Sequence, residues 1–129
     1  MRVLVCGGRD FSDRDLMART LAPYRPSPIT AVSEHKIIQG GAIGADTLAR
    51  EWAEVYGVPY REFPADWNKH GRAAGPIRNQ RMIDEGKPDL VIAFPGGRGT
   101  ADMISRAEKA GIRVMRVRPL PRSTKRIAT

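Results

Sequence analysis

Short apolar runs alternate with amphipathic stretches along most of this chain. The apolar runs are three to five residues long, mostly rich in Val, Ile and Leu and mostly bounded by Gly or Pro, which is typical of buried strands. They predict strands at Arg2 to Cys6, Lys36 to Ile38, Pro59 to Phe63, Leu90 to Phe94 and Arg113 to Val117. Ile29 to Val32 is interpreted either as a short extra strand or as a helix end.

The stretches between these runs place apolar residues every three or four positions, which favours helices with one buried face. Helices are expected after Ser12, which is a candidate N-cap, and at Asp46 to Tyr56, from Pro76 to Gly86, and at Thr100 to Ala110. An irregular loop is expected from Pro64 to Gly75, about twice the usual length for a connection of this kind.

Alternation of strand and helix predicts an α/β, Rossmann-like three-layer sandwich: a parallel sheet of about five strands with helices on both faces. Residues 1–117 would form this single domain, and residues 118–129 a basic C-terminal tail. In such sheets the ligand crevice lies beyond the carboxyl ends of the strands, where the strand order reverses.

Three glycine-rich turns follow predicted strands: GGRD at Gly7 to Asp10, QGGAIGAD at Gln39 to Asp46, and PGGRGTAD at Pro95 to Asp102. A strand that runs through glycines into a helix leaves backbone N–H groups bare at a positive helix end, which suits phosphate. Glycine is also the ordinary residue of any tight connection. Three such turns in one small chain favour a nucleotide or another phosphate-bearing ligand.

The PGGRGT turn shows this chemistry most fully. Gly96 and Gly97 would let the backbone approach a phosphate, Gly99 would permit close helix packing, and Thr100 would cap the helix or bind an oxygen. The neighbouring Arg98 can point at the same anion or at solvent.

Further polar residues are expected at the crevice. Arg78 and Arg81 lie three residues apart at a helix start and offer guanidinium groups to a phosphate, or they form a solvated pair. Asp46 and Asp10 either bind ribose hydroxyls or a base edge, or act only as local caps and helix-dipole partners. In the long loop, Asp66, Trp67, His70 and Arg72 combine a stackable ring with polar groups, although a lone histidine on a polar loop is more often simply exposed.

Composition narrows the alternatives. The longest apolar runs are too short to cross a bilayer, so a cytoplasmic protein without a membrane partner is expected. Cys6, the single cysteine, is interpreted as a buried hydrophobe. We find no metal-ligand spacing, no Ser-His-Asp or Cys-His arrangement and no sign of a cofactor. Of the net charge of +8, half lies in the tail, on Arg118, Arg122, Lys125 and Arg126. Such a tail can bind nucleic acid, form an oligomer contact or remain solvated.

The combination of PGGRGT, RNxxM at Arg78 to Met82 and GGxxGAD at Gly40 to Asp46 resembles the SLOG superfamily of Rossmann-like domains, in particular its YspA-type, YpsA-related branch, over residues 1–117. That superfamily includes LOG-type phosphoribohydrolases, the DNA-processing protein A family, and domains thought to sense nucleotide-derived ligands. The resemblance implies a nucleotide-derived ligand and a homo-oligomer. It also implies that Arg78 belongs to the active site.

One departure from the LOG-type pattern bears on catalysis. Those enzymes carry PGGxGTxxE, whose glutamate is thought to assist cleavage of the N-glycosidic bond, and the same spacing falls here on Met103. Asp102 is one residue earlier, about 100° away around the helix. Whether the protein is an enzyme therefore stays open; if it is one, a nucleoside-monophosphate N-glycosidic hydrolase is expected, with Asp46 or Asp102 as its acid.

The sequence thus predicts a nucleotide-binding protein, either a sensor or an enzyme, with a nucleic-acid-binding protein as the alternative. The expected ligand-binding residues are Gly7, Gly8, Arg9, Asp10, Gly40, Gly41, Asp46, Arg78, Asn79, Gly96, Gly97, Arg98, Gly99 and Thr100. The base, the number of phosphates and the oligomeric state are left undetermined.

Overall fold

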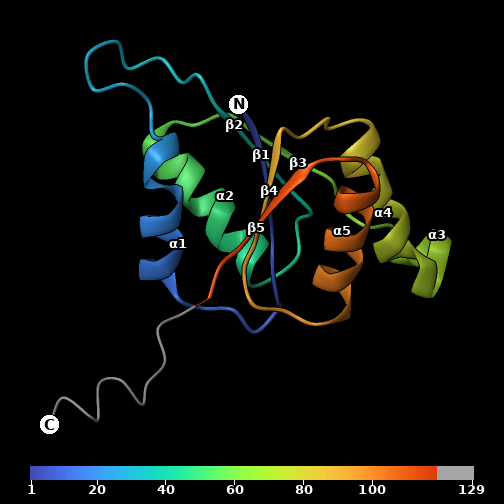
Figure 1. The fold of residues 1–129 in the computed structure, drawn as a ribbon. Helices are drawn as coiled ribbons and strands as arrows, with labels where there is room; N and C mark the ends of the chain where they lie inside the picture. The colour runs from blue at the N-terminus through green and yellow to red at the C-terminus, as the bar shows by residue number, and fades with distance from the viewer. Residues whose placement is uncertain (119–129) are drawn as a thin grey trace, which may run out of the picture.

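The computed structural model describes residues 1–118, which contain a five-stranded, fully parallel sheet with the strand order β3-β2-β1-β4-β5 (Figure 1). The strands are β1 (Arg2–Cys6), β2 (Lys36–Gln39), β3 (Tyr60–Glu62), β4 (Leu90–Ala93) and β5 (Arg113–Arg116). The helices are α1 (Arg14–Leu21), α2 (Ala45–Tyr56), α3 (Trp67–His70), α4 (Ala74–Asp84) and α5 (Arg98–Lys109), with 3-10 turns η1 (Ala22–Tyr24) and η2 (Gly71–Ala73). The predicted α/β sandwich is confirmed.

Alternate side chains of the central strand β1 enter two separate cores, as the two-residue period of a strand requires. Val3 and Val5 pack with α1 and α2 on one face of the sheet. Leu4 and Cys6 pack with α4 and α5 on the other face. Figure 1 shows the resulting three layers, with α1 and α2 on one side of the sheet and α3, α4 and α5 on the other.

The order of the strands reverses beside β1. The chain builds β1, β2 and β3 outward in one direction and then returns to place β4 on the other side of β1, where Val3 pairs with both Ile37 and Leu90. The connections that leave β1 and β4 therefore diverge to opposite faces of the sheet. This divergence opens a crevice at the carboxyl ends of the strands.

Four local predictions need correction. The N-cap of α1 is Asp13 and not Ser12, because the Asp13 carboxylate accepts a hydrogen bond from the backbone N–H of Leu16. Helix α4 begins at Ala74, so Pro76 lies in its first turn, where its missing N–H breaks no helical bond. The long loop holds α3 and η2. Residues 29–32 form neither a strand nor a helix end.

Two further predictions concern the ends of this fold. Within residues 1–118 we find no helix that is long and apolar enough to cross a membrane. Beyond Arg118, the expected basic tail lies outside the described residues, and with it the oligomer contact proposed for that tail.

Candidate functional site: a cleft at the carboxyl ends of the strands

An open cleft of about 1500 Å³ lies where β1, β2 and β4 end. It brings together the three glycine turns and the start of α4. All the residues expected to bind a ligand line it, as does Asp102, whereas Arg81, Asp66, His70 and Met103 do not. The three turns differ in what their backbone N–H groups already bind, and this difference decides what each turn can do.

The turn after β1 links the other two turns. Gly8 donates its N–H to the carbonyl of Pro95 at 2.8 Å, and its own carbonyl accepts from Ala45 N at 3.2 Å. A Cβ on Gly7 would lie 2.6 Å from that of Ala45, so glycine is needed here to allow three turns to meet. The N–H groups of Arg9 and Asp10 have no acceptor among residues 1–118 and face the cleft rim.

In the turn after β2, the N–H groups of the first three residues after the strand are bound within the turn. Asp46 Oδ2 accepts hydrogen bonds from the N–H groups of Gly40 and Ala42, both at 3.2 Å. Gly41 donates to Oε1 of the buried Gln39, which in turn binds Glu62 at 2.8 Å. Because these three amides are bound internally and a carboxylate stands between them, this part of the turn is not open to a phosphate.

The turn after β4, in contrast, has N–H groups that are open to the cleft. The N–H groups of Gly96, Gly97, Arg98, Gly99 and Thr100 have no acceptor within residues 1–118. The N-cap of α5 is Gly97, which makes no side-chain cap, so the positive end of a twelve-residue helix is open to the cleft. The Thr100 side chain is only 7% exposed, and its hydroxyl lines the same space without a partner in the described chain.

Two roles predicted for this turn are wrong. Thr100 does not cap α5 but is its third residue, and a Cβ on Gly99 would meet nothing within 4 Å, so Gly99 is not required for helix packing. The crowded position is Gly96, where a Cβ would collide with Thr100 Oγ1 and lie 2.7 Å from Gly8 N. A Cβ on Gly97 would again meet nothing within 4 Å, in the open cleft.

Asp46, the second residue of α2, is an unusual carboxylic acid. Its burial raises its pKa to about 6; the hydrogen bonds from Ala42 and Gly40 and the charge of Arg78 offset part of this rise, and Glu62 adds to it. The group is 7% exposed and lines the cleft. Asp46 therefore changes its charge only slightly below neutral pH, beside any bound ligand.

Arg78 ties α4 to the end of β2. Its Nη1 donates to the carbonyl of Gly40 at 2.6 Å and to that of Phe63 at 3.5 Å, and its Nε donates to Asn79 Oδ1 at 3.1 Å. Burial lowers the pKa of Arg78, while the nearby Asp46 raises it and Arg9 lowers it. Nη2 makes no hydrogen bond to residues 1–118 and is available to a ligand.

Of the other arginines predicted here, only some face the cleft. Arg81 turns outward and pairs with Glu85 at 2.8 Å, because it lies on the solvent side of α4. Arg9 and Arg98 are exposed at the cleft rim and form no ion pair with residues 1–118. The cleft therefore carries positive charge at its rim near the open end of α5.

Asp102 and Asn79 join α4 to α5. Asn79 Nδ2 donates to the Gly99 carbonyl at 3.2 Å and to Asp102 Oδ2 at 3.0 Å, and Arg106 Nε donates to the same oxygen at 2.8 Å. Burial raises the pKa of Asp102, but the hydrogen bonds from Arg106 and Asn79, together with the charges of Arg106 and Lys109, outweigh it and leave the pKa lowered. Asp102 is an ionised residue that positions the start of α5.

Met103 lies away from the cleft. It is 1% exposed and packs between the sheet and α4, with Leu4 and Met82 in the same core. The position that matches the LOG-type glutamate by spacing is therefore part of the apolar core in this protein.

The cleft also holds apolar residues that the sequence analysis did not assign to it. Phe11, Leu16, Ile43 and Met82 line it, together with Pro64 and the buried Cys6, whose pKa burial raises to about 12. The exposed Ile43, within the glycine-rich GGAIGAD turn, was the available signal. Of the polar loop residues, Trp67 and Arg72 reach the cleft, whereas Asp66 caps α3 by accepting from Lys69 N.

Comparisons with known proteins identify the family and agree with this fold. The family model of the YspA, cpYpsA-related SLOG family matches residues 1–70. The Gene 61 protein of Mycobacterium phage D29 is 39% identical over 122 residues, which cover 88% of this chain and 94% of that protein. The chain belongs to this SLOG family.

Membership of the SLOG family confirms the resemblance drawn from the sequence motifs. The X-ray structure of TM1055, a Northeast Structural Genomics Consortium target, is similar with a TM-score of 0.69 and 21% identity, over 98% of this chain and 79% of that one. At this identity the likeness concerns the fold alone. The same α/β fold is therefore shared over nearly the whole chain, beyond the residues that the family model matches.

Proposed function

We propose that this protein binds a nucleotide or nucleotide-derived ligand, with a phosphate group held at the open end of α5. The observation that carries the proposal is the run of N–H groups from Gly96 to Thr100 that have no acceptor within residues 1–118, beside the buried residue Thr100. Backbone N–H groups at a helix start donate to phosphate oxygens without any cost of reorganisation. Arg98 and Arg9 at the rim add positive charge that attracts an anion.

The charge distribution also supports one orientation of the ligand. Asp46 fills the centre of the β2 turn and repels a phosphate there above its pKa of about 6. The phosphate would lie at α5, and the sugar would lie towards Asp46, where a carboxylate can accept hydrogen bonds from hydroxyl groups.

A binding or sensing role is favoured over rapid turnover. N-glycosidic hydrolysis needs a carboxyl group near the ribose, but Met103 lies in the core and Asp102 is paired with Arg106 and Asn79. Asp46 is then the remaining cleft acid with a raised pKa. Any hydrolysis would depend on it and would be slow without the glutamate of LOG-type enzymes.

The variant Gly97→Val tests the phosphate site. Its side chain would project into the open cleft and block the approach of phosphate, while a Cβ meets nothing within 4 Å, so the fold should survive. We expect affinity for the four ribonucleoside 5′-monophosphates, measured by calorimetry, to fall at least tenfold. Arg81→Ala, outside the cleft, is the control and should bind like the wild type. Unchanged affinity in a folded Gly97→Val protein would refute the proposal.

Nucleic-acid binding is the second candidate, and the observation that favours it is the net charge of +8, half of it in residues 118–129. Binding that depends on this tail would weaken steeply with salt because it releases counterions. Mononucleotide binding in the cleft would be nearly independent of the tail. Oligonucleotide titrations at several salt concentrations, with and without residues 118–129, separate the two. Light scattering of the same two proteins tests the proposed homo-oligomer.

A further inference from the structure

Trp67 is the large aromatic side chain that this cleft leaves uncovered. It begins α3, is 54% exposed and lines the cleft. The other tryptophan of the chain, Trp52, is 6% exposed and packs against Tyr56 with ring centroids 5.3 Å apart. Leaving an indole half in water forgoes hydrophobic free energy, so an exposed tryptophan on a cleft wall points to a ligand surface.

Trp67 lies beside the start of α4 and remains 54% exposed. The ring comes near Gly75 at the start of α4, where a Cβ would lie 3.6 Å from Trp67 Cη2. A small residue at position 75 therefore supports the ring edge. Ile43, 64% exposed on the β2 turn, is a second apolar residue of the cleft lining.

The topology sets the separation between Trp67 and the phosphate site. Trp67 follows β3, α5 follows β4, and the strand order places β2 and β1 between them. Strands are about 4.8 Å apart, so the ends of β3 and β4 are separated by roughly 14 Å along the sheet edge. A ligand that reaches from one site to the other must be longer than a phosphate and its sugar. The cleft, at about 1500 Å³, has room for such a ligand.

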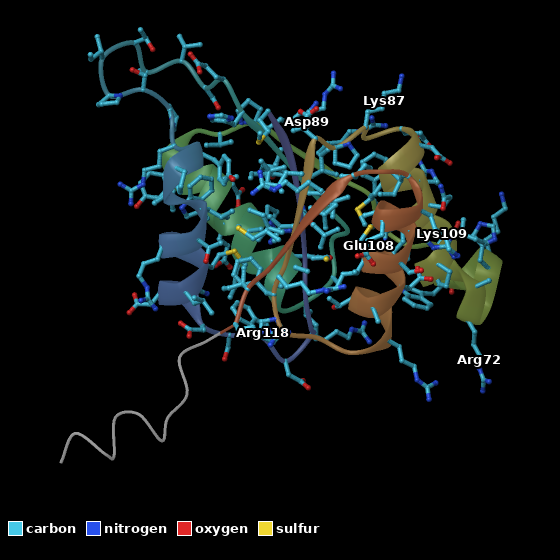
Figure 2. The ribbon with its side chains drawn as sticks, in the orientation of Figure 1. Arg72, Lys87, Asp89, Glu108, Lys109 and Arg118 are labelled. Atoms are coloured by element: carbon cyan, nitrogen blue, oxygen red, sulfur yellow. The ribbon has the colours of Figure 1, made fainter. Side chains whose placement is uncertain are left out.

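We infer that Trp67 forms the wall on which an aromatic base of the ligand stacks, so that the protein selects nucleotides over sugar phosphates. This inference rests on the proposed function, because it takes the phosphate to lie at α5. Stacking suits any base, since every base has a π face. Arg72 also lines the cleft and adds a cation on the Trp67 side. In Figure 2, Arg72 lies at the same end of the molecule as Arg118, opposite to Lys87 and Asp89.

The two tryptophans allow a direct test. In a Trp52→Phe protein, Trp67 is the sole indole, and its fluorescence reports on anything that stacks on it. We expect ribonucleoside 5′-monophosphates to quench this fluorescence saturably, and ribose 5-phosphate to bind without quenching it. In the wild-type background, Trp67→Ala should weaken nucleotide binding about tenfold or more and leave ribose 5-phosphate binding unchanged, while Trp67→Phe should retain most of the affinity.

The outcomes separate the inference from the function on which it rests. If Trp67→Ala binds nucleotides as tightly as the wild type, the stacking role is wrong and the phosphate site stands. Quenching by ribose 5-phosphate equal to that by nucleotides would also overturn it. If neither ribose 5-phosphate nor any of the nucleotides binds the wild-type protein, both the inference and the proposed function fall.

Discussion

Replacing Asp46 by Asn should change how the stability of this protein depends on pH. The carboxyl group is buried at the start of α2, and one of its oxygens accepts from both Gly40 N and Ala42 N. An asparagine oxygen can accept the same two hydrogen bonds. The substitution therefore removes chiefly the ionisation, together with the attraction to Arg78.

The size of the effect follows from the pKa. Burial raises the pKa of Asp46 from 3.8 to about 6, a difference of roughly two units at about 1.4 kcal/mol each. At a pH between these two pKa values, Asp46 is protonated in the folded state and ionised in the unfolded state. The stability that Asp46 contributes is thus fully present below pH 3.8 and is lost as the pH rises through 6. The total loss is about 3 kcal/mol.

Urea unfolding of the wild type and of Asp46→Asn, at intervals from pH 4 to pH 7, measures this difference. The stability of the wild type relative to the variant should fall by up to about 3 kcal/mol over that range. Asp102→Asn is the matched control with the opposite sign. The pKa of Asp102 is lowered in the folded state, so its contribution is present at neutral pH and is lost as the pH falls.

Two results would refute this reasoning. A difference between wild type and Asp46→Asn that stays constant from pH 4 to pH 7 would mean that Asp46 has an ordinary pKa and is solvated. A difference that grows with pH would mean that Arg78 and the backbone N–H groups outweigh burial.

Two further predictions concern the residues around this acid. Arg78→Ala should weaken the binding of nucleoside monophosphates, measured by calorimetry, about ten- to a hundredfold. It should also raise the pH midpoint of the Asp46 effect, because the charge of Arg78 lowers the pKa of Asp46. Unchanged affinity together with lower stability would mean that Arg78 has only a structural role. Met103→Glu should lower the melting temperature sharply without any gain in release of free base, because Met103 is 1% exposed in an apolar core; a stable variant that hydrolyses nucleotides would contradict the placement of this residue.

The sequence alone determined the architecture and the place of the site. Apolar runs of strand length alternate with helical patterns, and this alternation favours a parallel sheet, because the chain reverses once before each helix and once after it, so that the next strand runs parallel to the previous one. It also puts all three glycine turns at one edge, where the cleft lies. Local sequence signals were enough to predict the strands, helices and turns, because these depend on the hydrophobic period and on turn residues that are close together in the chain.

The tertiary structure decided which turn is open. The GGAIGAD and PGGRGT turns have similar sequences, but Asp46 and Gln39 bind the N–H groups of Gly40, Gly41 and Ala42 in the first turn. In the second turn, the N–H groups from Gly96 to Thr100 have no acceptor within residues 1–118. The tertiary structure also decided which side of each helix faces the sheet. Arg78 therefore lies in the cleft and Arg81 in solvent, and Met103 lies in the core while Asp102 lines the cleft. These outcomes depend on partners distant in sequence and on burial, which sets both hydrogen bonding and pKa, so spacing along the chain cannot reveal them.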